Sequence, residues 1–313
     1  MKFSFYTDIH LTDNIPRYRT DNYILSLVYK LQSVYELSLS QGCQCVTFGG
    51  DFFDRQKVAD FSVIQAAIKI IQDSGLKTYA CIGEHDLYGH NPNTFPDSAL
   101  SFVCEFAPNF QNLWEPIHLD NGVSFYAKHE WQKIEDIQNI PLDNSRYNVL
   151  LCHELLYNKK MPFGIINTVD LDLPFDLVCS GDLHCGYAPH KVKNTWYCNP
   201  GSLARKATSD SKRMPKIFII DVQKGYEPMI DSFNLPVGKA GHEVFSKGLG
   251  DIIKEFESGI DMTKFIQGFD EFKTERTDIY TLFENFKMNH PVKQDVVDYI
   301  ETLKKAKEES IIK

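Results

Sequence analysis

Residues 43–55 read CQCVTFGGDFFDR, an apolar run that stops at two glycines and an acid. The run from Cys43 to Phe48 is short and has the composition of a buried strand. Gly49 and Gly50 let the backbone approach a neighbouring group closely, and Asp51 follows them with a carboxylate. This segment predicts a strand whose carboxyl end carries a functional acid.

Four other apolar runs also end at side chains that bind metals or transfer protons. The runs are residues 3–6, 78–82, 149–152 and 177–179, and the segments after them are Asp8-Ile9-His10, Gly83-Glu84-His85-Asp86, His153 and Gly181-Asp182-Leu183-His184. In open α/β folds, the carboxyl ends of parallel strands meet along one edge of the sheet. We therefore expect these five loops to form one site.

The segments between these strands indicate an α/β fold. Helical spacing predicts a helix that Thr20 or Asp21 caps and Gly42 ends, and a second helix over residues 61–74. Residues 91–146 are less regular and predict a helix and edge strands. We expect two further strands, which belong to a second sheet, at residues 196–198 and 217–222.

A chain of 313 residues has room for one sizeable α/β domain and a smaller appendage. The composition shifts to helical, mixed-charge sequence after Leu235-Pro236-Val237-Gly238. We expect a catalytic domain over residues 1–235 and a helical C-terminal region over residues 236–313. Apolar positions between Val292 and Leu303 predict an amphipathic helix that packs on its own domain or docks into a partner.

The composition argues against a membrane protein and a disulfide framework. No run approaches the roughly 20 apolar residues that a membrane-spanning helix needs. Met1 leads straight into the first strand, which leaves no room for a signal sequence, so we expect a cytoplasmic location. Six of the eight cysteines fall in predicted strands and no C-x-x-C pair occurs, which favours reduced, buried thiols.

A net charge of -9 argues against a protein that clamps nucleic acid over its whole surface. The net charge does not exclude a nuclease, because bound divalent ions would offset the negative charge of the acidic residues in the motif loops. The stretch from Lys191 to Lys216 holds seven basic residues and one acid. We assign Arg17, Arg205 and Lys206 to substrate binding, with a solvent-facing surface as the alternative.

The motif residues suit phosphodiester hydrolysis by two metal ions. Two divalent ions about 3.5–4 Å apart stabilise the phosphoryl oxygens, activate water and assist the leaving oxygen. Asp51, after its glycines, is the expected bridge between the ions. Asp54 and Arg55 are expected to pair with each other and brace the same loop.

The motif order D-x-H, G-D-x-x-D-R, G-x-H-D, H and G-x-x-H resembles the calcineurin-like metallophosphoesterase superfamily over roughly residues 1–225. The G-D-F-F-D-R form and the turn Asn199-Pro200-Gly201-Ser202 most resemble the SbcD-type nuclease subunit of DNA repair and recombination complexes. The resemblance implies a calcineurin-like two-sheet β-sandwich flanked by helices, with a helical C-terminal extension.

The resemblance also implies a role for each motif residue. The first ion would be held by Asp8, His10, Asp51 and His184, and the second by Asp51, Glu84, His153 and Asp182. The catalytic residues would be His85, which contacts the phosphate and protonates the leaving oxygen, and Asp86, which orients His85. Glu84 stands where the family usually has Asn and Asp182 where it has His, so we expect Mn²⁺, with Mg²⁺ as the alternative, rather than zinc.

The leading hypothesis is a metal-dependent DNA exonuclease and endonuclease subunit that acts in DNA repair or recombination. By resemblance its partners would be DNA and an SbcC-like ATPase subunit, and a homodimer is allowed. A phosphatase or phosphodiesterase for a small nucleotide would share every ligand. A non-catalytic scaffold with the same fold is the third hypothesis, and the retention of His85 argues against it.

Overall fold

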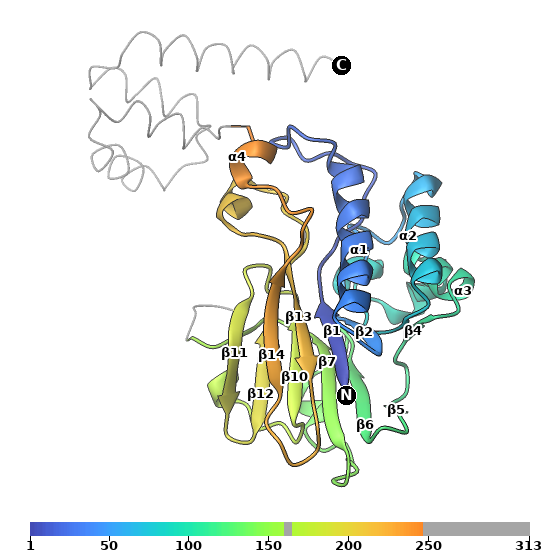
Figure 1. The fold of residues 1–313 in the computed structure, drawn as a ribbon. Helices are drawn as coiled ribbons and strands as arrows, with labels where there is room; N and C mark the ends of the chain where they lie inside the picture. Colours follow the sequence, from blue (N-terminus) through green and yellow to red (C-terminus); the bar gives the residue numbers. More distant parts are fainter. Residues whose placement is uncertain (160–164, 247–313) are drawn as a thin grey trace, which may run out of the picture. The chain divides into compact units, whose positions relative to one another are not determined.

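Two six-stranded sheets pack against each other in the computed structural model, which describes residues 1–159 and 165–246 (Figure 1). The first sheet has the order β14-β13-β1-β2-β3-β4. Its strands β1 to β4 run parallel, and β13 and β14 are antiparallel to their neighbours. The bounds are β1 Lys2–Tyr6, β2 Cys45–Phe48, β3 Lys77–Ala80, β4 Phe110–Asn112, β13 Lys216–Asp221 and β14 Met229–Asn234.

The second sheet has the order β11-β12-β10-β7-β6-β5. Its four central strands run parallel, and both edge strands are antiparallel. The bounds are β5 Ile117–His118, β6 Val123–Lys128, β7 Tyr147–His153, β10 Leu177–Gly181, β11 Tyr187–Val192 and β12 Thr195–Asn199, and a separate pair is formed by β8 Leu156–Tyr157 and β9 Ile166–Asn167.

Side chains that point to the inner face of each sheet form the hydrophobic core between the two sheets. Phe3 and Phe5 of β1 belong to the same buried cluster as Phe125 of β6 and Leu151 of β7. The ring of Phe3 lies edge-on to that of Phe125, with centroids 5.2 Å apart. Because successive side chains of a strand point to opposite faces, Tyr6 packs in a different cluster, on the outer face of the first sheet.

Helices cover that outer face (Figure 1). The helix bounds are α1 Tyr23–Ser40, α2 Phe61–Ser74, α3 Ala99–Phe106 and α4 Gly241–Val244, with short 3₁₀ helices η1 Glu84–Asp86, η2 Pro92–Asp97, η3 Ile134–Ile137, η4 Thr168–Asp170 and η5 Thr208–Lys212. The range predicted for α2 is confirmed, and Gly75 ends it in the left-handed conformation. The side chain of Asn22, rather than Thr20 or Asp21, caps α1 by accepting from the Leu25 N–H.

The α/β class with two sheets flanked by helices is confirmed, with one correction in the sheets. The predicted strand at 196–198 joins the second sheet as β12, but the strand predicted at 217–222 is β13, which pairs antiparallel with β1 in the first sheet. Its apolar composition fits either sheet, because both pack into the same core. The pairing depends on contacts with β1 that are far away in the sequence.

The first compact unit extends to Ser246, past the boundary predicted near residue 235. Val244 accepts a hydrogen bond from the Thr20 N–H at 3.1 Å, and the Ser246 N–H donates to the Tyr18 carbonyl at 2.9 Å. These bonds tie the segment to the loop after β1. The helical region predicted beyond it, including the amphipathic helix up to Leu303, lies outside the described residues.

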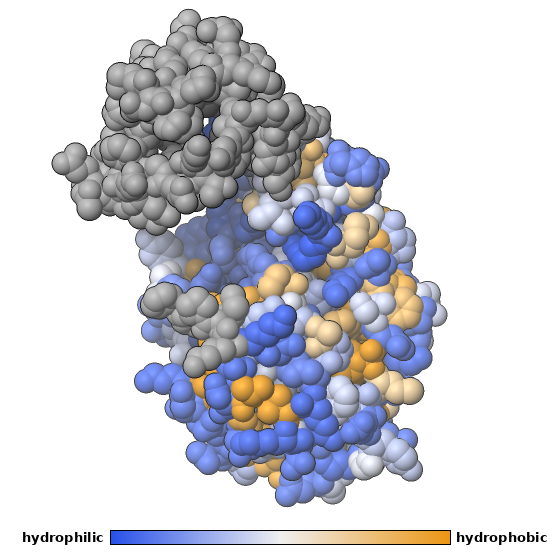
Figure 2. Space-filling model, turned by 90° about the vertical axis from the view of Figure 1, so that its left-hand side faces the viewer, coloured by the Kyte–Doolittle hydropathy of each residue, from blue (hydrophilic) through white to orange (hydrophobic). Residues whose placement is uncertain are grey.

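The cysteine prediction is confirmed, because all eight cysteines are free and the six expected in strands are buried. No helix in residues 1–159 and 165–246 is long and apolar enough to cross a membrane. Figure 2 shows one face of the molecule, which is mostly hydrophilic and carries its hydrophobic residues in small separate patches.

Candidate metal centre

The predicted site residues lie where the carboxyl ends of both sheets meet. The loops after β1, β2 and β3 of the first sheet carry Asp8, Asp51 and His85, and the second sheet supplies the last residue of β7, His153, and the loop after β10. His153 pairs in register with Gly181 at the end of β10. The expectation of a single sheet edge is therefore corrected: the site is formed between two sheets.

Glycines allow the two sheets to come this close. A Cβ atom at Gly50 would lie 2.4 Å from Nδ1 of His153, and one at Gly181 would lie 2.3 Å from the carbonyl oxygen of Gly49. A Cβ at Gly83 would lie 2.1 Å from Oδ1 of Asp51. These contacts are shorter than van der Waals contact, so larger residues would push the donor side chains apart.

The backbone is strained at the same place. Asp8, His10, Asp51 and Asp182 have φ values of 51°, 47°, 60° and 71°, in the left-handed region that non-glycine residues rarely adopt. Backbone hydrogen bonds hold the first two loops together, with His10 N–H donating to the Asp51 carbonyl at 3.1 Å. Such strain costs about 1–3 kcal/mol per residue and is concentrated at functional sites.

Six side chains form three overlapping groups of donor atoms, each within 4.8 Å. The groups are Asp8 with His10 and His184, His10 with Asp51 and His85, and Asp8 with Asp51 and His153. Sharing of Asp8, His10 and Asp51 between groups is the arrangement expected for two neighbouring ions. Imidazole nitrogens and carboxylate oxygens are the donors that divalent transition metals prefer.

His153 has the surroundings of a candidate metal ligand. Its Nδ1 lies 2.8 Å from the Gly49 carbonyl, which can only accept, so Nδ1 carries a proton. Nε2 is buried without a hydrogen-bond partner and lies 3.6 Å from Oδ1 of Asp51. Burial lowers the pKa of His153, but Asp51, Asp8 and Asp182 outweigh it and raise the pKa to about 9. The position of Nε2 therefore attracts a positive charge, which a divalent cation can supply.

His10 faces the first group with Nε2, which lies 3.1 Å from Nε2 of His184. Burial and then the charge of Lys206 hold the pKa of His10 well below its usual value, so its imidazole stays neutral. Its Nδ1 lies 3.7 Å from a carboxylate oxygen of Asp54. At this distance the two groups do not form a hydrogen bond, and Nδ1 of His10 is buried without a partner.

Asp51 has the geometry of the predicted bridge. Oδ1 lies 3.6 Å from Nε2 of His153, whereas Oδ2 lies 3.6 Å from Nε2 of His10. Its two oxygens thus face different donor groups. Burial raises the pKa of Asp51 well above its usual value, which reflects the cost of a bare anion at this position. The residues present therefore fit two divalent cations.

Glu84 and Asp182 are not members of the three donor groups found among the described residues, so their place in the second ligand set stays a prediction. The Glu84 side chain is 44% exposed, with Oε1 3.5 Å from Nε2 of His85. Asp182 instead donates its backbone N–H to both carboxylate oxygens of Asp8, at 3.2 and 3.1 Å. Burial raises the pKa of the Asp182 carboxyl to about 6.

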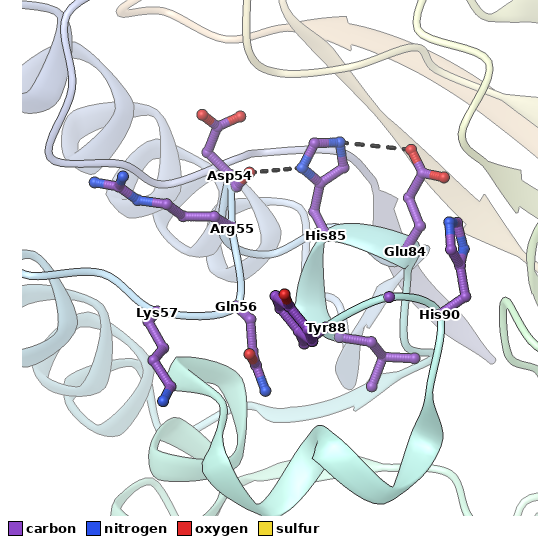
Figure 3. A pocket seen from close by; sticks show the side chains of 10 residues that line it. Asp54, Arg55, Gln56, Lys57, Glu84, His85, Tyr88 and His90 are labelled. Carbon is purple, nitrogen blue, oxygen red and sulfur yellow. Dashed lines mark hydrogen bonds and ion pairs between the residues drawn. The ribbon is translucent and has the colours of Figure 1, made fainter.

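Asp86 braces a loop, and the predicted orientation of His85 by Asp86 is corrected. Its carboxylate accepts from the backbone N–H groups of Asp51, Phe52, Phe53 and Gly83 at 3.1–3.3 Å. His85 is held instead by the backbone carbonyl of Asp54, 2.5 Å from Nδ1, as Figure 3 shows. Asp86 is therefore a positioning residue for the Asp51 loop.

The three residues assigned to substrate binding have different surroundings. Arg205 is 1% exposed and donates to the carbonyls of Arg213 and Lys239, so its substrate role is corrected to a structural one. Lys206 forms an ion pair with Asp54 beside His10, close to the donor groups. Arg17 is exposed next to the Tyr18 ring.

The sequence missed several supports of the site. Asp54 does not pair with Arg55, because Arg55 forms its ion pair with Asp13. Thr7 donates its hydroxyl to Asp8 at 2.6 Å, and Ser202 donates its hydroxyl to the Asp8 carbonyl at 2.7 Å. The only signal in the sequence for the role of Thr7 is its position next to Asp8. The sequence contains no such signal for Ser202, because its contact with Asp8 forms only in the folded chain.

Comparison with solved structures finds similar folds at low sequence identity. TT1561 of Thermus thermophilus matches with a TM-score of 0.50 and 13% identity over 75% of this chain and 98% of that one. A dimetal phosphatase from Danio rerio matches with a TM-score of 0.48 and 8% identity over 75% and 99%. YfcE, a phosphoesterase from E. coli, matches with a TM-score of 0.37 and 14% identity over 75% and 100%.

At 13% identity, the likeness to TT1561 shows a common fold and carries no information on activity. No protein-family model matches the chain. No curated protein matches it significantly. The function is therefore argued from the site itself.

Proposed function

We propose that this chain is a metal-dependent DNA nuclease that hydrolyses phosphodiester bonds at a two-metal centre. The observation that carries the proposal is the sharing of Asp51 between two donor groups, with Nε2 of His153 and Nε2 of His10 on opposite oxygens. Bound divalent cations would supply charge that stabilises the phosphoryl oxygens and activates water.

The residues of the chain divide the remaining work. The buried carboxylates of Asp8 and Asp51 and the imidazoles of His10, His153 and His184 would hold the cations. His85 is one-third exposed at the edge of the centre, with Nδ1 turned to the Asp54 carbonyl and Nε2 3.5 Å from Oε1 of Glu84. From this edge its Nε2 would exchange a proton with the leaving oxygen.

The openness of the site favours a polymer over a small nucleotide. The side chains of His184, Glu84 and His85 are 42%, 44% and 34% exposed, so the edge of the centre lies at the surface. A small-molecule site buries most of its ligand, whereas a DNA backbone needs access along the surface. The motif order and the Asn199–Ser202 turn, which contacts Asp8, support the SbcD-type nuclease and hence an SbcC-like ATPase partner.

The identity of the metal is part of the proposal. The donor groups found among the described residues contain four imidazoles and two carboxylates. We keep manganese as the expected ion and include magnesium and zinc in the test.

The test incubates purified protein with linear DNA, with bis-p-nitrophenyl phosphate and with p-nitrophenyl phosphate, in each metal and in chelator. Cleavage of DNA and of the diester with manganese, lost in chelator and in Asp51→Asn, is the expected result. Cleavage of the monoester alone would indicate the phosphatase. Absence of cleavage in every metal, with and without an SbcC-like ATPase, would indicate the scaffold.

A further inference from the structure

A pocket of about 590 Å³ opens directly beside the metal centre. One wall is the segment from Asp54 to Lys57 after β2, and the other runs from Glu84 to His90 after β3 (Figure 3). The pocket shares His85 with the donor groups. A chemical group bound in this pocket therefore lies next to His85, whose Nε2 is the proposed proton donor to the leaving oxygen.

Tyr88 presents an aromatic ring in this pocket (Figure 3). It is 73% exposed, the largest value among the exposed large hydrophobic residues of the described chain. Its backbone is fixed, because its N–H donates to the Thr94 hydroxyl at 2.9 Å and its carbonyl accepts from the Asn91 N–H at 3.2 Å. The loop thus holds out a ring that packs against little of its own chain.

The opposite wall carries two exposed cations, Arg55 and Lys57, beside the half-buried Asp54. The Arg55 side chain is 48% exposed, and its ion pair with Asp13 uses one nitrogen of the guanidinium. Lys57 is exposed and forms no ion pair with the described residues. Exposed cations of this kind contact phosphate oxygens without selecting a sequence.

We propose that the pocket binds the nucleoside unit attached to the scissile phosphate, with its base stacked on Tyr88 and the next phosphate near Lys57. This inference rests on the proposed function and names the part of the substrate that the site recognises. An aromatic face beside cations is the arrangement that binds single-stranded nucleic acid, and it accepts every base because every base has a π-face. A volume of about 590 Å³ also lies within the range of small-ligand pockets.

The test compares two single-stranded oligonucleotides that share one backbone. One carries thymine throughout, and the other carries abasic residues around the scissile bond. With manganese, the wild-type chain should cleave the thymine oligomer with the higher kcat/KM. Tyr88→Ala should reduce this preference by about 5- to 150-fold, the equivalent of one base stack, and Tyr88→Phe should retain it.

Tyr226→Ala is the matched control. Tyr226 is 68% exposed in the turn between β13 and β14, at the end of the first sheet opposite the metal centre. It should leave the preference at the wild-type value. Inhibition by thymidine 5′-monophosphate in the wild type, weakened in Tyr88→Ala, would support the pocket as the nucleoside site. Equal inhibition of the wild type and Tyr88→Ala would mean that the nucleotide binds elsewhere, which would count against the inference.

Two results would overturn the inference: equal cleavage of both oligomers by the wild type, or an unchanged preference in Tyr88→Ala. Failure of the proposed function is distinct, because the wild type would then cleave neither oligomer nor bis-p-nitrophenyl phosphate.

Discussion

Nδ1 of His85 lies 2.5 Å from the backbone carbonyl oxygen of Asp54, so the loop after β2 orients the side chain delivered by the loop after β3. Because a carbonyl only accepts, Nδ1 carries a proton, and Nε2 faces the exposed edge of the centre, 3.5 Å from Oε1 of Glu84. The loop that carries Asp51, the proposed bridge, thus also sets the direction of the proposed acid.

Removal of that acid separates chemistry from metal binding. His85→Ala should lower kcat for diester cleavage by about 10²-fold or more, as expected for a general acid. The number of manganese ions bound, measured by calorimetry, should stay at the wild-type value. Loss of one ion in this variant would instead make His85 a ligand, in line with its place in one donor group.

Asp86→Asn tests the bracing role. The amide would turn N–H donors toward the backbone N–H groups of Asp51 and Gly83 in a buried position. The free energy of unfolding, from urea denaturation, should fall by about 1–3 kcal/mol. Asp73→Asn, on the exposed face of α2, is the control and should change it by less than about 0.5 kcal/mol. If Asp86→Asn has wild-type stability but a shifted pH–rate profile, Asp86 acts on His85, as the sequence predicts, and does not brace the loop.

The strands and the donor residues could be predicted from the sequence because both depend on local pattern. The runs before Asp51 and His153 are both apolar. Strand β2 ends at Phe48, just before the glycines that precede Asp51, and β7 ends at His153 itself. The sheet to which β13 belongs could not be predicted, because its pairing with β1 spans the whole domain.

Side-chain partners within the site were also beyond the sequence. Glu84 follows a strand just as the residues of the donor groups do, yet its long side chain extends to the surface beside His85. Arg205 belongs to a basic stretch that predicts a surface, but its guanidinium finds carbonyl acceptors in the interior. A residue's place next to a motif shows which loop carries it. The direction in which its side chain points depends on tertiary packing.

Gly83→Ala tests the close approach at the bridge. The new Cβ would lie 2.1 Å from Oδ1 of Asp51, so the carboxylate must move. Manganese affinity should fall by about 10- to 100-fold, as for other changes that displace a ligand. Gly75→Ala is the control: it meets no atom within 4 Å, and with φ at +66° it should lower stability without lowering manganese affinity. Equal manganese affinities in both variants would mean that Asp51 does not ligate.

Arg205→Met tests the structural assignment of the buried arginine. The carbonyls of Arg213 and Lys239 would lose their donor, and the free energy of unfolding should fall by about 1–3 kcal/mol. Lys206→Met, at the neighbouring position beside Asp54, should instead raise KM for DNA. An Arg205→Met variant with wild-type stability and weakened DNA binding would show that Arg205 binds the substrate.

The most direct test of the central claim is anomalous diffraction at the manganese edge from crystals of the protein grown with manganese. The account predicts two peaks about 3.5–4 Å apart on either side of the Asp51 carboxylate, one near His10 and His184 and the other near His153. A single peak, or peaks that leave Asp51 uncoordinated, would contradict the two-metal centre.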